Sequence, residues 1–515
     1  MTRAHKPVRR GLVVAVLAAA SILLSGCFAV PSPPSKTPDR APDASGVSAE
    51  LLPYYEQELV WEACEAGLDC TTVTAPLDWA DPSVGEIELA VIRKRAAGGE
   101  PLGSLLTNPG GPGASGVGLI RDSVDYVIGK DLRRSYDVIG FDPRGVGEST
   151  AVKCFDTAEM DNYLFGIADA PRNSPAWIDE VVASGAEFAA ACEKNSGGIL
   201  PYINTKSAAR DLDLLRGVLG DEKLNYLGFS YGTFLGATYA ELFPERVGRL
   251  VLDGAIDPTT SSLDVGTTQA LGFESALRAF MADCLTTKGC AFRGTVDQAM
   301  ADLGALLAAA ERSPLPTADG RLVGSDTMLT GIIAALYSQG SWEFLRNALA
   351  AALTGDGSQM LFLADFYYNR EDGRYLDNST EAFTAYNCVD YPVENDPVAI
   401  AASNARVLAG APTIAPFWVS DAPDQCEQWP APPVGTRGEI HAKGAAPILV
   451  VGTTNDPATP YEWSVALAEQ LDSGVLITRV GEGHTGYSQG NACVDAAVEA
   501  YFLSGKVPDG PLLCE

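Results

Sequence analysis

The chain is poor in basic residues and in histidine. Its 515 residues include 36 Lys and Arg against 66 Asp and Glu, a formal net charge of −30, and only three His. Because nucleic-acid binding requires a clustered basic surface, this composition argues against a nucleic acid as partner. No Cys-X-X-Cys pair and no Gly-Lys-Ser/Thr of a phosphate-binding loop occurs. We therefore expect no metal site and no cofactor.

The apolar run at the N-terminus is too short to span a membrane as a helix. It covers residues 11–24, follows a basic stretch and ends in Leu24-Ser25-Gly26-Cys27. This ending resembles the lipobox of bacterial lipoproteins, in which the peptide is cleaved before the Cys and the thiol is lipidated. We expect a lipoprotein signal peptide over 1–26, with an ordinary signal peptide as the alternative. A Pro/Ser/Asp-rich tether follows the lipidated Cys27 and extends to residue 50.

These features predict an exported protein. Its lipid anchor would hold it on the outer face of the cytoplasmic membrane, from which it could later be shed. Cysteine usage agrees, because the eleven Cys leave an even number once Cys27 is set aside, as is typical of an oxidising compartment. The sequence alone leaves the pairing open. Proximity along the chain favours Cys64–Cys70, Cys154–Cys192, Cys284–Cys290, Cys388–Cys426 and Cys493–Cys514.

The pattern of apolar runs predicts an α/β protein with a mostly parallel sheet and helices on both faces. Residues 85–260 alternate short apolar runs with amphipathic stretches, and the strand pattern resumes only near 446. The residues between read as mainly helical, which suggests a cap inserted into one core. We expect the core over 51–258 and 436–515, and the cap over 259–435. The expected strands are 87–93, 103–108, 136–141, 224–228, 249–252, 446–452 and 474–480, and the expected helices of the core include 207–219 and 492–502.

Ser230 is the expected nucleophile. It is the centre of Gly228-Phe229-Ser230-Tyr231-Gly232, with an expected strand directly before it and an apolar helix directly after it. That context is what a nucleophile elbow requires, since a strained turn between strand and helix exposes the hydroxyl. Ser488 lies in a second Gly-X-Ser-X-Gly, but a Gly-rich loop precedes it. We interpret Ser488 as a coincidence.

A serine nucleophile needs a base, and the choice of His is narrow. His5 lies in the signal peptide and His441 in a charged stretch, whereas His484 follows the strand 474–480 in a Gly-rich loop. We expect His484 to be the base. Asp456, after the preceding strand, is the expected acid, because this fold orders its triad Ser, acid, His. Asp253, at the end of the strand after the nucleophile helix, is the rival.

The oxyanion hole requires two backbone N–H donors. Tyr231, the residue after the nucleophile, should supply one. The loop Asn108-Pro109-Gly110-Gly111-Pro112-Gly113 should supply the other, and its prolines have no N–H to give. That leaves Gly110 or Gly111, and we favour Gly111. The charged turn of residues 142–149 should support the site structurally.

Together these motifs resemble the tripeptidyl aminopeptidase-type secreted hydrolases, relatives of the proline iminopeptidases. The resemblance covers nearly the whole mature chain. It rests on Pro76-Leu77-Asp78-Trp79, the loop 108–113, the turn 142–149, the elbow at Ser230, Asn387-Cys388-Val389-Asp390 and the Asp456 and His484 loops. Where proline iminopeptidases usually begin the oxyanion loop with His, this chain has Pro109, which shifts the resemblance toward the tripeptidyl group.

The resemblance implies a serine exopeptidase that releases short N-terminal pieces, typically tripeptides, from peptides with a free amino group. An esterase or lipase with the same triad is the alternative enzyme. A solute-binding lipoprotein is the non-catalytic alternative, although it would have no need of an ordered Ser, Asp and His. For the substrate amine we expect a carboxylate in the segment that re-enters the core, with Asp390 and Glu394 as candidates. In so acidic a chain both carboxylates could equally be simply solvated.

Overall fold

The computed structural model describes residues 40–435 and 437–515. The expected signal peptide, Cys27 and most of the tether lie outside these residues. Within them, no helix is both long and apolar enough to cross a membrane. The described residues belong to one compact unit.

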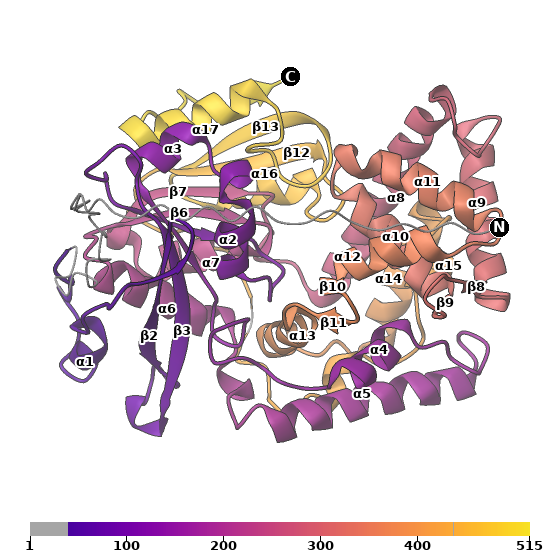
Figure 1. The fold of residues 1–515 in the computed structure, drawn as a ribbon, viewed down its shortest axis with the longest axis horizontal. Coiled ribbons are helices and arrows are strands. Elements are labelled where there is room, and N and C mark those ends of the chain that lie inside the picture. The colour runs from indigo at the N-terminus through magenta and orange to yellow at the C-terminus, as the bar shows by residue number, and fades with distance from the viewer. Residues whose placement is uncertain (1–39, 436) are drawn as a thin grey trace, which may run out of the picture. The chain divides into compact units, whose positions relative to one another are not determined.

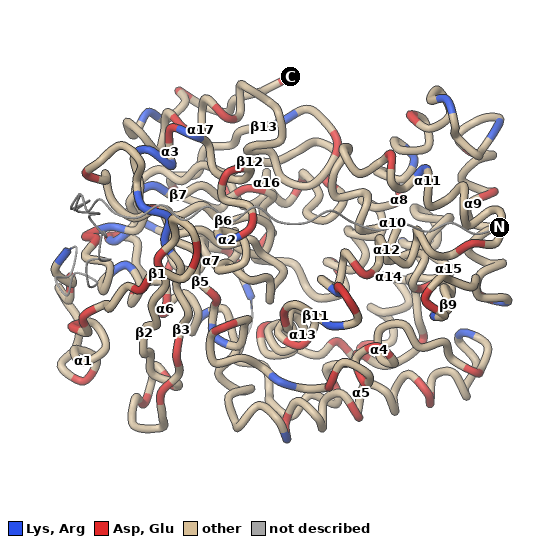
Figure 2. Tube along the Cα trace, viewed as in Figure 1, with Lys and Arg blue, Asp and Glu red and all other residues tan. Residues whose placement is uncertain are grey.

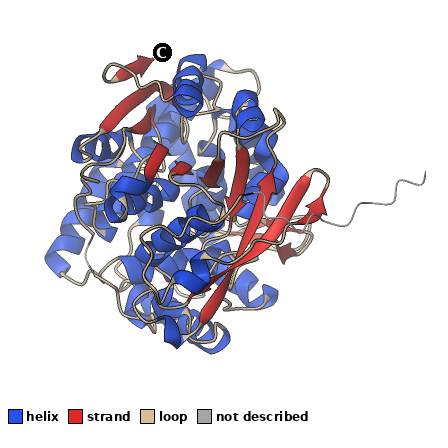
Figure 3. Ribbon diagram, turned by 90° about the vertical axis from the view of Figure 1, so that its left-hand side faces the viewer, coloured by secondary structure: helices blue, strands red, loops and turns tan. Residues whose placement is uncertain are grey.

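The centre of this unit is a ten-stranded sheet (Figure 3). Its strand order is β1-β2-β3-β5-β4-β6-β7-β12-β13-β14. The strands are β1 (Glu62–Glu65), β2 (Leu68–Pro76), β3 (Glu86–Lys94), β4 (Ser104–Asn108), β5 (Asp137–Phe141), β6 (Leu224–Phe229), β7 (Val247–Asp253), β12 (Ile448–Asn455), β13 (Gly474–Glu482) and β14 (Leu512–Cys514).

The sheet is parallel from β5 to β14 and antiparallel at its β1 end. β3, which corresponds to the expected strand 87–93, pairs antiparallel with both β2 and β5, within a sheet that is mostly parallel as expected. The short connection of residues 77–85 between β2 and β3 accounts for their antiparallel pairing, because a parallel crossover needs a dozen or more residues. The sequence reading also missed β1, β2 and β14.

Helices cover both faces of the sheet. Successive side chains along a strand point to opposite faces, and in the buried strands the side chains on both faces are apolar. In β7, Leu250 and Leu252 belong to one hydrophobic cluster, while Val251 belongs to another. The first cluster includes side chains of α1, α6, α7 and α16, and the second includes side chains of α2, α3 and α17. These helices are α1 (Leu52–Tyr55), α2 (Gly116–Val127), α3 (Lys130–Ser135), α6 (Thr205–Val218), α7 (Tyr231–Leu242), α16 (Tyr461–Gln470) and α17 (Ala492–Ser504).

Between β7 and β12 the chain forms a helical block, most of which packs around a third hydrophobic cluster. Two short hairpins, β8–β9 and β10–β11, belong to the same stretch. The block contains α8 (Ser262–Thr286), α9 (Val296–Arg312), β8 (Leu315–Pro316), β9 (Leu322–Val323), α10 (Ser325–Leu336), α11 (Trp342–Ala352), α12 (Ser358–Tyr367), β10 (Arg370–Glu371), β11 (Arg374–Tyr375), α13 (Ser379–Asp390), α14 (Pro397–Gly410) and α15 (Ala415–Trp418).

Two helices from the first half of the chain join this block. α4 (Thr157–Phe165) and α5 (Pro175–Asn195) interrupt the chain between β5 and α6 (Figure 1). Arg370 of the block pairs with Asp161 of α4 through two hydrogen bonds of 2.7 and 2.8 Å. Arg172, just before α5, lies 2.6 Å from Asp326 of α10. The layer above the sheet is therefore built from two separate insertions, where the sequence suggested one.

Five disulfides are present in the structure, and they have the pairing favoured by proximity along the chain. Two of them fasten helices that carry the inserted layer. Cys388 near the end of α13 bonds to Cys426, and Cys192 of α5 bonds to Cys154 ahead of α4. The five bonds are Cys64–Cys70, Cys154–Cys192, Cys284–Cys290, Cys388–Cys426 and Cys493–Cys514.

A buried ion pair lies beneath the charged turn 142–149. The guanidinium of Arg144 donates two hydrogen bonds of 2.7 Å to Asp211 of α6, and both side chains are at most 1% exposed. Arg144 also donates to the carbonyl oxygens of Pro76 and Leu77, and Trp79 donates to Asp211 at 2.9 Å. The pair thus joins the turn, α6 and the segment after β2 in one network.

Removing one partner of this pair should destabilise the fold strongly. Asp211→Asn leaves the Arg144 charge uncompensated in the core, so we expect the free energy of unfolding to fall by about 3–5 kcal/mol. Urea unfolding with the disulfides intact measures this. Glu148→Gln is the control, because Glu148 forms an exposed pair with Arg121 at 2.9 Å and should change stability by at most about 1 kcal/mol. Similar small changes in both variants would contradict the assignment.

Candidate active site

Ser230 lies in a sharp turn between β6 and α7. Its φ of 55° and ψ of −123° are strained for a residue with a side chain. Glycines on both sides make this turn possible. A Cβ at Gly228 would lie 2.4 Å from the carbonyl oxygen of Gly232, and a Cβ at Gly232 would lie 2.8 Å from Asn108 Oδ1. This is the local geometry of a nucleophile elbow.

His484 and Asp456 meet at the carboxyl ends of the neighbouring strands β12 and β13. His484 Nδ1 lies 2.9 Å from both carboxylate oxygens of Asp456. The backbone N–H groups of Ala458, Thr459 and Thr485 also donate to that carboxylate. These backbone donors fix the position of the Asp456 carboxylate, which is almost fully buried.

The other ring nitrogen, Nε2 of His484, is buried and has no hydrogen-bond partner among residues 40–435 and 437–515. The ring lies close to Gly254, where a Cβ would be 3.1 Å from His484 Cε1. The carbonyl of the preceding Asp253 accepts the N–H of Ser230 at 2.9 Å, which places the imidazole beside the elbow. Burial lowers the pKa of His484, but the charge and hydrogen bond of Asp456 raise it more, so the net pKa is raised.

Asp253, the rival acid, has different partners. Its carboxylate accepts the backbone N–H groups of Gly486 and Tyr487 at 2.8 Å each. Burial raises the pKa of Asp253 to about 7. The hydrogen bond to the imidazole therefore comes from Asp456, while Asp253 holds the loop that follows His484.

The loop after β4 lies against the elbow. A Cβ at Gly110 would lie 2.8 Å from Ser230 Cβ and 3.1 Å from the Tyr231 nitrogen, so only glycine fits there. The N–H of Gly110 donates to Asn108 Oδ1 at 3.0 Å and is therefore occupied. In the described part of the chain, the N–H of Gly111 has no such partner. Tyr231 begins α7, where backbone N–H groups are free of helical bonds.

Two residues that the sequence reading missed also contact His484. The carbonyl of Tyr337, after α10, accepts the His484 N–H at 2.8 Å, and the two rings meet edge to face at 5.3 Å. Thr459 Oγ1 donates to Asp456 at 3.1 Å and lies 3.3 Å from His484 Nδ1. An Asp followed by Thr three residues later is a turn pattern that could have pointed to Thr459. Nothing in the sequence around Tyr337 identifies it.

The expected substrate-binding carboxylates form hydrogen bonds to other residues than His484. Asp390 accepts the N–H and the hydroxyl of Thr205 at 3.0 and 2.5 Å, and burial raises the pKa of Asp390 to about 6. Glu394 accepts the N–H of Asp396 at 2.9 Å. Their role in substrate recognition stays a prediction. The hydroxyl of Ser488 contacts the Val127 carbonyl, and the His441 ring is 53% exposed.

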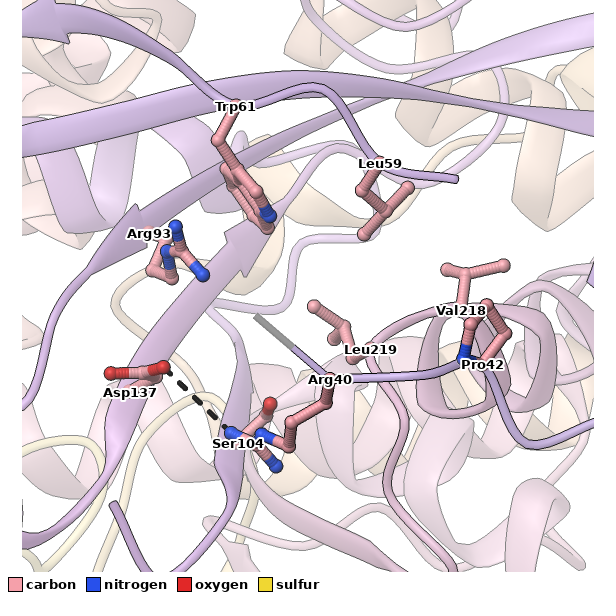
Figure 4. A pocket seen from close by; sticks show the side chains of 9 residues that line it. All are labelled: Arg40, Pro42, Leu59, Trp61, Arg93, Ser104, Asp137, Val218 and Leu219. Carbon is pink, nitrogen blue, oxygen red and sulfur yellow. Dashed lines mark ion pairs between the residues drawn. The ribbon is translucent and has the colours of Figure 1, made fainter. Parts of the chain in front are cut away.

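A small pocket at the other end of the sheet is a poor site for this chemistry (Figure 4). Ser104 and Asp137, which line it, begin β4 and β5, and Arg40 lies 3.7 Å from Asp137. Sites in sheets of this kind gather at the carboxyl ends of the strands, where the elbow and His484 lie. Among the described residues, no group of three or more His, Cys, Asp and Glu side chains could hold a metal ion.

The parallel sheet, the strained elbow and the Asp-His pair at the strand ends define an α/β-hydrolase. Residues 411–514 match the family model described as TAP-like protein. Serine protease Hip1 of Mycobacterium tuberculosis is 35% identical and covers 100% of this chain and 99% of its own length. Carboxylesterase B of the same species is 38% identical over 96% of each chain. Tripeptidyl aminopeptidase of Streptomyces lividans is 31% identical over 88% of this chain and 86% of its own.

The chain belongs to this TAP-like family of α/β-hydrolases, and it is a serine hydrolase of the peptidase class. Among solved structures, proline iminopeptidase of Mycobacterium smegmatis aligns over 84% of this chain and 100% of its own, with 17% identity and a TM-score of 0.33.

Substitution of Asp456 and substitution of Asp253 should lower kcat to very different extents. Asp456→Asn should lower kcat by about 10⁴-fold, because an amide at this position favours the wrong imidazole tautomer. Asp253→Asn should lower kcat much less, because the Asp253 carboxylate bonds backbone N–H groups and not the imidazole. Wild-type kcat/KM should fall as the pH drops through the raised His484 pKa. Steady-state assays across pH measure all three, with Ser230→Ala as the inactive control. The reverse ranking would assign the acid to Asp253.

Proposed function

We propose that the chain is a serine exopeptidase that releases short peptides, tripeptides above all, from the free N-terminus of peptides outside the cell. The observation that carries the proposal is the Asp456–His484 hydrogen bond, with a His484 Nε2 that no described residue bonds and that lies beside the Ser230 elbow. The relatives support the peptidase part of the proposal, since Hip1 is named a serine protease and the Streptomyces relative a tripeptidyl aminopeptidase.

In this mechanism Ser230 Oγ attacks the scissile carbonyl while its proton passes to His484 Nε2. The carbonyl oxygen becomes an oxyanion that accepts the N–H groups of Gly111 and Tyr231. Collapse of the tetrahedral intermediate breaks the C–N bond, and His484 returns the proton to the leaving amine. Water then attacks the acyl-enzyme with His484 again as base, the ester C–O bond to Ser230 breaks, and His484 returns the proton to Ser230 Oγ. Asp456 stabilises the imidazolium in both halves of the reaction.

An esterase with the same triad is the second candidate. The 38% identity to carboxylesterase B supports it, and both reactions need the same nucleophile, base and oxyanion donors. The two candidates differ in whether a free amine on the substrate matters.

Two anilides that share one leaving group, compared with an ester, would separate the candidates. A tripeptidyl anilide with a free amine, its N-acetylated form and a short acyl ester are offered to the purified mature enzyme. For an exopeptidase, we expect kcat/KM to be at least tenfold higher for the free-amine peptide than for the blocked one, since a charge-assisted contact contributes about 1.5–3 kcal/mol. Equal rates on both peptides with faster ester cleavage would support the esterase.

We further propose that the enzyme is exported and anchored through Cys27. The lipobox-like sequence at residues 24–27 supports the anchor, and five disulfides are typical of an oxidising compartment.

Cell fractionation tests the anchor. Wild-type enzyme should remain with the membrane fraction, whereas Cys27→Ser should be released or left unprocessed, because the acyl chains attach to that thiol. Cys64→Ser is the control, since it changes a cysteine outside the lipobox by breaking the Cys64–Cys70 disulfide, and this variant should stay membrane-bound. Wild-type protein found in the cytoplasm with free thiols would refute both the anchor and the export.

A further inference from the structure

Acidic side chains are spread over the strands of the sheet and the inserted helices alike (Figure 2). An acidic residue in this chain therefore becomes informative only through its contacts. Asp390, the last residue of α13, has contacts that lead to the nucleophile elbow. Both of its carboxylate oxygens bond Thr205, the first residue of α6. Oδ1 accepts the Thr205 N–H at 3.0 Å, and Oδ2 accepts the Thr205 hydroxyl at 2.5 Å.

The hydroxyl of Thr205 continues this chain of hydrogen bonds to Tyr231. Thr205 Oγ1 lies 2.6 Å from the phenol oxygen of Tyr231. A hydroxyl carries a single proton, and an ionised carboxylate can only accept. Because the Thr205 proton is used in the bond to Asp390, the Tyr231 hydroxyl donates to Thr205 Oγ1. Thr205 and Tyr231 are 1% and 5% exposed, so water does not compete for the bond between them.

The side chain of Tyr231 is held at its ring as well. Tyr386, one turn before Asp390 in α13, packs against it edge to face, with ring centroids 5.6 Å apart. Tyr386 is itself fixed, because its hydroxyl donates to the carbonyl oxygen of Arg144 at 3.0 Å. α13 therefore contacts Tyr231 in two ways, directly through Tyr386 and, by way of Thr205, through Asp390.

Tyr231 bears on the chemistry through its backbone. It follows Ser230 as the first residue of α7, and its N–H is an expected oxyanion donor. The oxyanion loop lies against the same nitrogen, since a Cβ at Gly110 would be 3.1 Å from it. Such a donor acts only within about 2.7–3.1 Å of the place where the oxyanion forms, and a displacement of about 1 Å can lower a rate by about 100-fold. The anchoring of the Tyr231 side chain therefore matters for the rate.

We propose that Asp390 and Thr205 are positioning residues of the oxyanion hole, which act through the Tyr231 hydroxyl to hold the Tyr231 N–H where the oxyanion forms. Neither side chain takes part in bond making or breaking. Asp390 thus serves the transition state and not the substrate, since Thr205 occupies both of its carboxylate oxygens. The inference rests on the acyl-transfer mechanism proposed above, and it applies equally to a peptide and an ester, because both pass through the same oxyanion.

Three roles of Asp390 differ in what they predict. Its carboxylate accepts the first N–H of α6, where a negative charge is favourable in itself. A purely structural role therefore predicts a lower melting temperature with an unchanged kcat per active site. A positioning role predicts a lower kcat on every substrate with an unchanged KM. Recognition of the substrate amine predicts a higher KM that is confined to substrates with a free amine.

The experiment measures kcat and KM per titrated active site on a tripeptidyl anilide, its N-acetylated form and a short acyl ester. Tyr231→Phe removes only the phenol oxygen and keeps the backbone N–H. We expect its kcat to fall by about 10- to 100-fold on all three substrates, since loss of a whole oxyanion donor costs about 100- to 1000-fold. Thr205→Val should have a similar effect, whereas Thr205→Ser, which keeps the hydroxyl, should retain most of the wild-type kcat.

A transition-state analogue gives a second readout. The adduct of a peptidyl trifluoromethyl ketone with Ser230 carries an oxyanion, so its inhibition constant should rise in Tyr231→Phe by the factor by which kcat falls. Thr238→Val is the matched control. Thr238 lies on α7 two turns beyond Tyr231, is buried, and has a hydroxyl without a hydrogen-bond partner among the described residues. Its kcat and inhibition constant should equal those of wild type.

Wild-type kcat in Tyr231→Phe would overturn the inference and leave the acyl-transfer mechanism intact. Should Thr205→Val not fold, Tyr231→Phe and Thr205→Ser decide without it. A rise in KM for the free-amine peptide alone in Asp390→Asn would assign Asp390 to the substrate and would also overturn the inference. Wild-type activity in Ser230→Ala would refute the mechanism first, and the inference with it.

Discussion

The buried contact between Arg144 and Asp211 joins the parts of the structure that the candidate site depends on. The guanidinium donates to the Asp211 carboxylate, to the backbone carbonyls of Pro76 and Leu77 at the end of β2, and to the carbonyl of Tyr202 ahead of α6. The backbone of the same residue accepts the hydroxyl of Tyr386 from α13 at 3.0 Å. A desolvated ion pair contributes little net stability by comparison with apolar packing. Its specific geometry, however, fixes the turn 142–149, which holds both the start of α2 and the start of α13.

The two buried carboxylates of the site, Asp456 and Asp253, have different roles. Asp456 is bound by several N–H donors and by the imidazole, so its charge is stabilised where His484 needs it. Asp253 is equally buried but only fastens the backbone after His484, and burial raises the pKa of Asp253 to about 7. Two ionised carboxylates this close would repel each other. Asp456 is the partner of the base because its carboxylate bonds the imidazole, whereas the Asp253 carboxylate bonds backbone N–H groups.

The sequence could predict the parts of the fold that local patterns encode. The elbow at Ser230, the strands β4 to β7, β12 and β13, and the loops of Asp456 and His484 all follow from apolar runs that end in Gly, Asp or Pro. The antiparallel start was missed because β2 carries Thr and Asp on its exposed side, so its apolar pattern is weak. Tyr337 and the joining of α4 and α5 to the helical block were missed for another reason. They depend on contacts between segments more than 100 residues apart, such as Arg370 with Asp161, which no local pattern records.

The position of α13 explains how one layer can serve both the fold and the site. Its Ala382, Ala385, Tyr386 and Val389 belong to the cluster that also contains side chains of α6 and α7, whereas most of the helical block packs around a separate cluster. Cys388 adds a covalent bond to Cys426 at its far end. α13 therefore packs with the core, and its start is joined to the turn 142–149 through Asn378. α10, which is followed by Tyr337 next to His484, packs instead in the separate cluster of the helical block.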